Sequence, residues 1–164
     1  MSAQAHIAYL DLKLQTQGKV AGDSAVTSLN RKGLIEVWQF DHQVVSPRDA
    51  ATGMATGRRI EKPVRITTPV GSASPLLFQA VVSNETLVKA VFRFFKHDRA
   101  GKELEYFRIT LEDGTISSMS TRLNMGDEAG FHDEYHEIEF TYRKITVENL
   151  EAKKSAIDDW QITS

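Results

Sequence analysis

The sequence predicts a mainly β protein, an antiparallel two-sheet barrel or sandwich with one short α-helix on its side and a long projecting loop. Three observations support this fold class. β-Branched and aromatic residues recur in extended runs along the chain, only one stretch carries good helix signals, and turn residues separate the runs at short intervals. The chain of 164 residues fits a single domain, which at this size buries about 70% of its unfolded surface.

The first third of the chain alternates extended and irregular segments. His6–Lys13 predicts a first strand, and Gln15–Lys32, rich in Gly, Ser, Thr and Asn, predicts a loop. Leu34–Val45 is β-branched and aromatic and predicts a strand that is partly covered on both faces. After a further irregular segment, Ile60–Val70 resumes an extended pattern, which Pro63 breaks as it would at a sheet edge or bulge.

The irregular segment Ser46–Arg59 (SPRDAATGMATGRR), called the arm below, is too long for an ordinary connection. Most loops have about 2–6 residues, and unstructured loops beyond roughly a dozen are usually functional or disordered. No apolar periodicity in the arm predicts a helix or a strand. Gly53 and Gly57 loosen its backbone, whereas Pro47 stiffens it. An arm that projects from a β domain indicates a protein that holds another molecule.

The only convincing helix is predicted at about residues 74–83. Ser74 is a suitable N-cap, Pro75 suits the first helical position, and Asn84 is a plausible end. The apolar residues expected on one face are Leu76, Leu77, Ala80 and Val81.

The chain then returns to extended patterns. Leu87–Lys96 predicts a strand with Val88, Ala90, Phe92 and Phe94 on one side, and Asp98–Gly101 connects it to a return strand, Glu103–Glu112. Asp113–Gly114 predicts a type I′ hairpin turn, because both central residues of that turn need positive φ.

The last third is expected to complete the sheet. Thr115–Leu123 is predicted to pair across the turn at Asp113–Gly114, and Asn124–His132 is predicted to form a second long loop. Glu134–Val147 predicts a final long strand. The tail, residues 148–164, carries no decisive pattern. The total is about seven or eight strands and one helix.

Composition excludes several classes of protein. The formal net charge is −2 and the isoelectric point about 6.2, so the basic excess typical of nucleic-acid binding is absent. There is no cysteine, which excludes disulfides and Cys-ligated metal centres. No basic segment followed by a long apolar run marks a signal peptide or membrane span, so we expect synthesis and folding in the cytoplasm without membrane insertion.

Candidate chemistry has simpler explanations. His132 and His136 lie on a predicted strand, where residues four apart are about 13 Å from each other, too far to share a metal ion. Paired carboxylates, Glu103 with Glu105 and Asp158 with Asp159, have no recognisable nucleophile beside them. No phosphate-binding loop, dinucleotide motif or nucleophile elbow is present. We therefore expect no metal, cofactor or catalytic residue.

Two clusters allow a second interpretation. The aromatic residues Phe92, Phe94, Phe95, Tyr106 and Phe107 suit a base-stacking platform, but a β core is the simpler reading. Basic residues gather at the end of the arm and just beyond it (Arg58, Arg59, Lys62, Arg65), and acidic residues gather within 126–139. These are either unrelated solvated faces or two patches that meet between subunits.

Several stretches match one known family in order and spacing. They are Gly33–Val37 with Phe40–His42, Thr52–Gly53 through Thr56–Ile60, Ser74–Ala80, Glu103–Phe107 with Leu111–Asp113, Glu137–Tyr142 and Asp158–Trp160. By these stretches the chain resembles the haemolysin-coregulated protein (Hcp) family, the tube subunits of bacterial type VI secretion systems. The resemblance covers about residues 5–147.

The resemblance implies a barrel of two antiparallel sheets with one helix. It implies a non-enzymatic homohexameric ring, and rings that stack into a hollow tube. The implied partners are the spike protein, the contractile sheath, baseplate components and effector proteins in the lumen. It also implies secretion by the type VI machine without a signal peptide. Because the family's long loop contacts adjacent subunits, the implied interface residues are Pro47, Arg48, Thr52, Gly53, Gly57 and Arg58.

Two alternative functions follow from the same sequence. One is an effector-binding adaptor or chaperone ring, in which tube formation is secondary. The other is a single-strand nucleic-acid-binding β-barrel, which the acidic balance disfavours.

Overall fold

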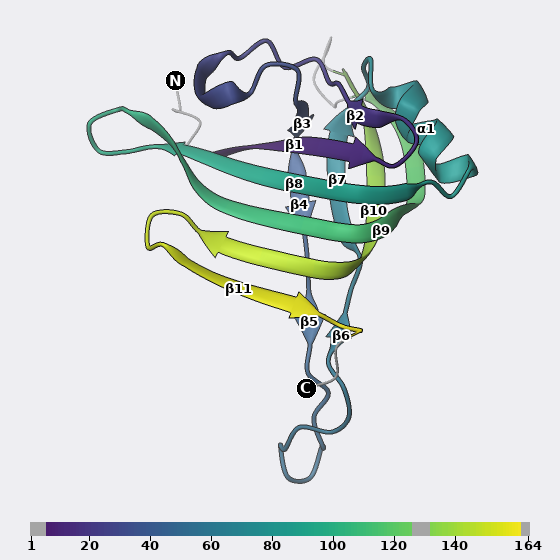
Figure 1. Cartoon of the computed structure of the whole chain (residues 1–164), viewed down its shortest axis with the longest axis vertical. Helices are drawn as coiled ribbons and strands as arrows, with labels where there is room; N and C mark the ends of the chain where they lie inside the picture. The colour runs from purple at the N-terminus through teal and green to yellow at the C-terminus, as the bar shows by residue number, and fades with distance from the viewer. Residues whose placement is uncertain (1–5, 126–131, 162–164) are drawn as a thin grey trace.

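The computed structural model describes residues 6–125 and 132–161, and most of their regular structure belongs to one nine-stranded antiparallel sheet (Figure 1). The helical elements are α1 (Ser74–Val82) and a single 3₁₀ turn, Ser28–Asn30. The strands are β1 (His6–Leu14), β2 (Gly18–Val20), β3 (Ile35–Val37), β4 (Gln39–Asp41), β5 (Val44–Val45), β6 (Ile60–Glu61), β7 (Val64–Pro69), β8 (Thr86–His97), β9 (Glu103–Met125), β10 (His132–Asn149) and β11 (Lys154–Asp159).

The sheet closes on itself into a barrel. Its strand order is β2-β1-β8-β9-β10-β7-β4, with β3 paired to β1 and β11 paired to β10. Strand β3 pairs with β1 on one side of the sheet. Strand β4 begins one residue after β3 ends and pairs with β7 on the other side, so the segment from β3 to β4 closes the sheet. Trp38 sits at the junction and donates its backbone N–H to the Thr67 carbonyl at 2.8 Å. The predicted antiparallel barrel is confirmed.

Strand β10 pairs along its whole length with β9, and these two strands tie the two layers of the barrel together. Their register runs from Phe107 opposite Asn149 to Met125 opposite His132. The first part of β9 also pairs with β8, the early part of β10 pairs with β7, and its late part pairs with β11. Each long strand therefore bends from one layer into the other, as Figure 1 shows.

The hairpin predicted at Asp113–Gly114 is wrong, because β9 runs straight through both residues. Asp113 does have positive φ, +55°. A Cβ atom on Gly114, however, would lie 1.8 Å from the carbonyl oxygen of Thr141 on β10. The glycine thus allows two backbones to approach closely at the bend, a different use of the same residue type. Thr115–Leu123, predicted to pair back across the turn, is the continuation of β9 and pairs with β10 instead.

The other boundaries follow the predictions with local differences. The loop predicted at Gln15–Lys32 contains β2 and the 3₁₀ turn, and the strand predicted at Leu34–Val45 divides into β3, β4 and β5. Pro63 separates β6 from β7 as expected, and the uncertain tail forms β11. Of the loop predicted at Asn124–His132, the two ends are strand and the remainder lies outside the described residues.

The predicted helix is confirmed, but its cap is not. Ala73, without a capping side chain, occupies the N-cap position, and Ser74 is the first helical residue. The Ser74 hydroxyl instead accepts a hydrogen bond from the Gly71 N–H and lies 2.7 Å from His136 Nε2. Only Leu77 and Ala80 of the expected apolar face are buried, whereas Leu76 is 38% exposed.

Aromatic residues fill the centre of the barrel. Phe92 and Phe140 are fully buried, and Phe40 packs on Phe92 edge to face at 5.0 Å between ring centroids. Phe95 lies in a second small cluster with Tyr9 and Leu34. The interpretation of the aromatic cluster as core is confirmed for Phe92 and Phe95, which are buried, and for Phe94 and Phe107, which are partly buried against the core, whereas Tyr106 belongs to neither core cluster. In the described parts of the chain, no helix is long and apolar enough to cross a membrane.

Candidate functional site

The arm leaves one end of the barrel as a narrow ribbon (Figure 1). At its base β5 pairs with β6, and nearer the tip Arg48 and Ala55 form an isolated antiparallel bridge. The Thr56 N–H donates to the Pro47 carbonyl at 2.8 Å. The projecting segment was therefore predicted correctly, whereas the expectation that it holds no strand pairing of its own is wrong.

Asp49 closes the tip of the arm. Its Oδ1 accepts hydrogen bonds from the N–H groups of Ala51 at 2.7 Å and Thr52 at 3.0 Å, and these bonds, chiefly the one from Thr52, hold the pKa of the carboxyl below its usual value. The Gly53 N–H donates to the Asp49 carbonyl at 2.9 Å, and Gly53 itself has φ +71°. Asp49 was missed in the sequence, although an Asp followed by small residues and a Gly is typical of such a turn.

The six residues implied as interface candidates all lie on this projection. Thr52 and Gly53 are at the tip, Arg48 is on the outgoing side, and Gly57 with Arg58 is on the returning side. All of them are exposed except Pro47, which is partly exposed.

The last strand holds the root of the arm. The Arg59 guanidinium donates to both carboxylate oxygens of Asp158, at 2.6 and 2.5 Å, and Arg58 donates to the Trp160 carbonyl at 3.0 Å. The hydrogen bonds from Arg59 lower the pKa of Asp158. Because β11 is paired to β10, the arm root is fixed to the barrel through the end of the chain.

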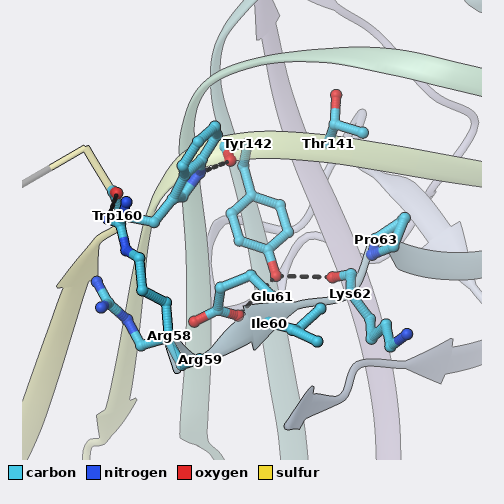
Figure 2. A pocket seen from close by; sticks show the side chains of 9 residues that line it. All are labelled: Arg58, Arg59, Ile60, Glu61, Lys62, Pro63, Thr141, Tyr142 and Trp160. Atoms are coloured by element: carbon cyan, nitrogen blue, oxygen red, sulfur yellow. Dashed lines mark hydrogen bonds between the residues drawn. The ribbon is translucent and has the colours of Figure 1, made fainter. Parts of the chain in front are cut away.

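A partly buried polar network lies beside this contact, and we call it the root network: His42, Glu61, Tyr142 and the Lys62 carbonyl. Figure 2 shows all of its members except His42. The Tyr142 hydroxyl lies 2.8 Å from the Lys62 oxygen, 3.0 Å from Glu61 Oε2 and 3.0 Å from His42 Nε2. Burial is the main cause that raises the pKa of Glu61, and Asp158 adds to it. Burial likewise raises the pKa of Tyr142, so the phenol stays neutral.

The root network forms one wall of a hollow of about 390 Å³. The Trp160 indole donates to the Tyr142 carbonyl, which fixes the ring at the rim (Figure 2). The remaining lining is mixed: Ile60 and Pro63 are apolar, and the Lys62 side chain carries a positive charge. The arrangement holds backbone in position, and within the described residues no group of three His, Cys, Asp or Glu could bind a metal.

Two of the four basic residues noted in the sequence bind carboxylates of their own chain. Arg65 donates to Glu139 at 2.6 Å across the β7–β10 pair, and Arg59 is bound to Asp158. These two residues are therefore no longer candidates for a contact between the basic patch of one subunit and the acidic patch of another. Arg58 also bonds its own chain, at the Trp160 carbonyl.

Glu105 and His136, two of the residues considered above for chemistry, are held by neighbouring side chains. Glu105 accepts from Arg93 and Arg108, and these two guanidinium groups outweigh burial and lower the pKa of Glu105. His136 is buried between Ser74 and Thr121, with Thr121 Oγ1 2.9 Å from its Nδ1. The side chain of His132, the other proposed metal ligand, lies outside the described residues.

The sequence matches a known protein family and a protein of that kind. A family profile described as "Type VI secretion system effector, Hcp" matches residues 9–148. The chain is 37% identical over 129 residues to a protein of Pseudomonas aeruginosa strain PAO1 called the major exported protein, covering 77% of this chain and 75% of that protein.

Solved structures agree along nearly the whole chain. A crystal structure of an Hcp protein, 26% identical, superposes with a TM-score of 0.86 and covers 97% of this chain and all of the other. A double tryptophan mutant of Hcp1 from the E. coli EAEC 042 pathovar is 32% identical with a TM-score of 0.79, covering 94% and 98%. The secreted protein Hcp3 of Pseudomonas aeruginosa is 28% identical with a TM-score of 0.76, covering 95% and 99%.

Proposed function

This chain belongs to the Hcp family of the type VI secretion system, and on that premise we propose that it is a structural subunit of the secretion tube. The family is one of structural secretion proteins rather than enzymes. In this proposal six copies close into a ring, and rings stack into a hollow tube that leaves the cell with the spike protein. The contractile sheath and baseplate are its further partners, and effector proteins travel in the lumen.

One observation carries the proposal: the family match and the structural superposition extend over the body of the barrel and the arm together. The family profile spans residues 9–148, which includes the whole arm, and the Hcp crystal structure superposes over 97% of the chain. The relative in Pseudomonas aeruginosa is named an exported protein. Export of this chain by the type VI machine, without a signal peptide, is part of the proposal.

The arm is the assembly element of this proposal, and its interface residues are Pro47, Arg48, Thr52, Gly53, Gly57 and Arg58. Two features support the assignment. The tip is closed by hydrogen bonds of its own backbone, and the root is bound to β11, so the arm holds its shape away from the barrel. A preformed element loses little conformational entropy when a partner binds it.

The mass of the assembly tests the proposal directly. Size-exclusion chromatography with light scattering is expected to give six times the chain mass of 18.4 kDa, and electron microscopy is expected to show rings or tubes. A monomer at high concentration would overturn the ring. A ring that binds effectors but never stacks would favour the adaptor or chaperone function instead.

A shortened arm tests the assigned element. Since the Thr56 N–H already bonds the Pro47 carbonyl, an Asn-Gly turn can replace residues 48–55 without straining the ribbon. We expect an unchanged barrel by circular dichroism and thermal unfolding, together with loss of rings or tubes. Normal assembly of the shortened protein would contradict the role of the arm.

A further inference from the structure

The arm tip presents two side chains that its own chain does not engage. Among the described residues, Arg48 makes no side-chain hydrogen bond or ion pair, whereas Arg58 and Arg59, the other cations of the arm, are bound to β11 or the residue after it. Met54, across the tip, is 68% exposed. The tip therefore offers a guanidinium and a thioether, and both groups make favourable contacts with aromatic rings.

A second hollow, of about 330 Å³, has the complementary chemistry. It is lined by Trp38, Gln39, Thr67, Tyr135 and Glu137, and we call it the Trp38 hollow. Trp38 is 44% exposed. Two neighbours fix the aromatic rings: Glu36 accepts from the indole N–H at 3.1 Å, and the Asn124 amide donates to the Tyr135 hydroxyl at 2.9 Å.

The charge of the Trp38 hollow is negative. Glu137 is in its wall, and Glu36 stands beside the indole. Among the described residues the ion-pair partner of Glu137 is Arg122, at the long distance of 3.7 Å, and Arg65 on the neighbouring strand is bound to Glu139 instead. A carboxylate with a distant partner, next to two aromatic rings, suits a guanidinium that can stack and form an ion pair at once.

The arm of the same chain does not reach this hollow. Trp38 lies between β3 and β4, within the body of the barrel, and the chain then runs through β4 and β5 before the arm projects from the lower end of the view (Figure 1). The arm tip and the Trp38 hollow thus lie far apart along the long axis of the molecule. Only a second copy can bring them together, in a contact that joins two different surfaces of identical chains.

We propose that the arm tip of one copy docks in the Trp38 hollow of the next copy, with Arg48 stacked on Trp38 and facing Glu137, and with Met54 against the indole. This contact rests on the proposed tube function and names the surface that receives the arm. It joins two different surfaces of successive copies, so it can continue from copy to copy, either closing into a ring or extending along a tube.

Cysteine cross-linking tests the contact in the full chain, and the chain is suited to it because it contains no cysteine. In the double variant Met54→Cys with Gln39→Cys, oxidation of the assembled protein is expected to give a ladder of disulfide-linked dimers, trimers and longer species. Either single variant is expected to give no ladder. As a matched control, Met54→Cys is combined with Arg99→Cys on the exposed β8–β9 turn, which also should give none. A ladder from the control, or none from the test pair, overturns the proposal.

Charge reversal supplies an independent test. Arg48→Glu and Glu137→Arg are each expected to weaken association about tenfold or more, whereas the double variant recovers most of the loss because the pair is restored with opposite signs. An equimolar mixture of the two single variants should also recover in part, since it contains intact arms and intact hollows on different chains. Arg99→Glu controls for net charge and should leave association unchanged.

The two proposals fail differently. If the shortened arm abolishes assembly but the reversals do not, the arm is the assembly element and the Trp38 hollow is not its receptor. If the shortened arm assembles normally, the role of the arm falls and this contact falls with it.

Discussion

The substitution Gly114→Ala tests the bend of β9 most sharply. A Cβ atom at this position would lie 1.8 Å from the Thr141 carbonyl oxygen and 2.8 Å from both the Thr141 carbonyl carbon and the Tyr142 Cα. All three are backbone atoms of β10, which cannot rotate away as a side chain tip would. The two strands must therefore separate locally, and hydrogen bonds between β9 and β10 lengthen or break.

The magnitude follows from this geometry. Overpacking that shifts backbone costs typically about 1–3 kcal/mol, and a contact this short belongs at the upper end, so we expect a loss of about 3 kcal/mol in the free energy of unfolding. For a chain of this size, that corresponds to a melting temperature lower by roughly 6–12 °C.

Gly101→Ala is the matched control. Gly101 has φ +82°, and nothing lies within 4 Å of a Cβ placed on it, so the substitution carries backbone strain without steric overlap and should cost about 1–2 kcal/mol. Urea unfolding of both variants and the parent, at one protein concentration because assembly adds to apparent stability, measures the difference. A Gly114→Ala variant no less stable than Gly101→Ala would refute the close approach of β9 and β10.

Three further predictions concern ion pairs and pH. Arg59→Lys keeps the charge but cannot hold both oxygens of Asp158, and because both side chains are nearly a third exposed, we expect only a small decrease of the urea midpoint. Because the pKa of Glu61 is raised, stability is lost as pH rises through that pKa and the buried carboxyl ionises. Glu61→Gln should therefore show a flatter dependence of the urea midpoint on pH above about 4.5. An unchanged slope would contradict this. Burial lowers the pKa of His136, so its contribution to stability is complete above about pH 6.5 and is lost as pH falls, because the unfolded chain takes up the proton first. His136→Asn should remove that part of the acid dependence in the same titration.

Local sequence signals predicted most strands and the helix, but they could not distinguish two uses of Asp113–Gly114. The dipeptide fits a hairpin turn, and it equally fits a bend at which another strand comes close. What decides is the pairing of β9 with β10 over long distances in sequence, with Gly114 opposite Tyr142. No pattern within a few residues of Gly114 carries that information.

Long-range pairing also decides which side chains of β8 point into the core, and the local alternation does not show it. Strict alternation predicts that Val88 points inward, yet Leu87 is fully buried and Val88 is 37% exposed. The register with β1 shifts at this place, since Lys13 faces Lys89 while Leu14 faces Leu87. An irregularity of this kind reverses the alternation on one side of it, and its position depends on the neighbouring strand.

The arm was found from its length and composition, whereas its root was not. Arg59 and Asp158 are 99 residues apart, and Tyr142 and Glu61 are 81 residues apart. The sequence marked Arg59 as one of a group of free basic residues, because nothing local shows that the last strand returns beside it. Such contacts appear only when the order of strands in the barrel is known.

This division between a fixed root and an unoccupied tip bears on how the arm works. Each side chain ordered on binding costs about 0.5–1.5 kcal/mol, so an arm that had to fold on its partner would lose much of the energy of a small contact. Here the backbone bonds of the tip and the Arg59–Asp158 pair order the ribbon in the single subunit. Arg48 and Met54 are left exposed at its end. Less of the free energy of the contact is therefore lost to ordering the arm. Arg59 and Asp158, which fix the arm root, affect assembly without touching the neighbouring copy.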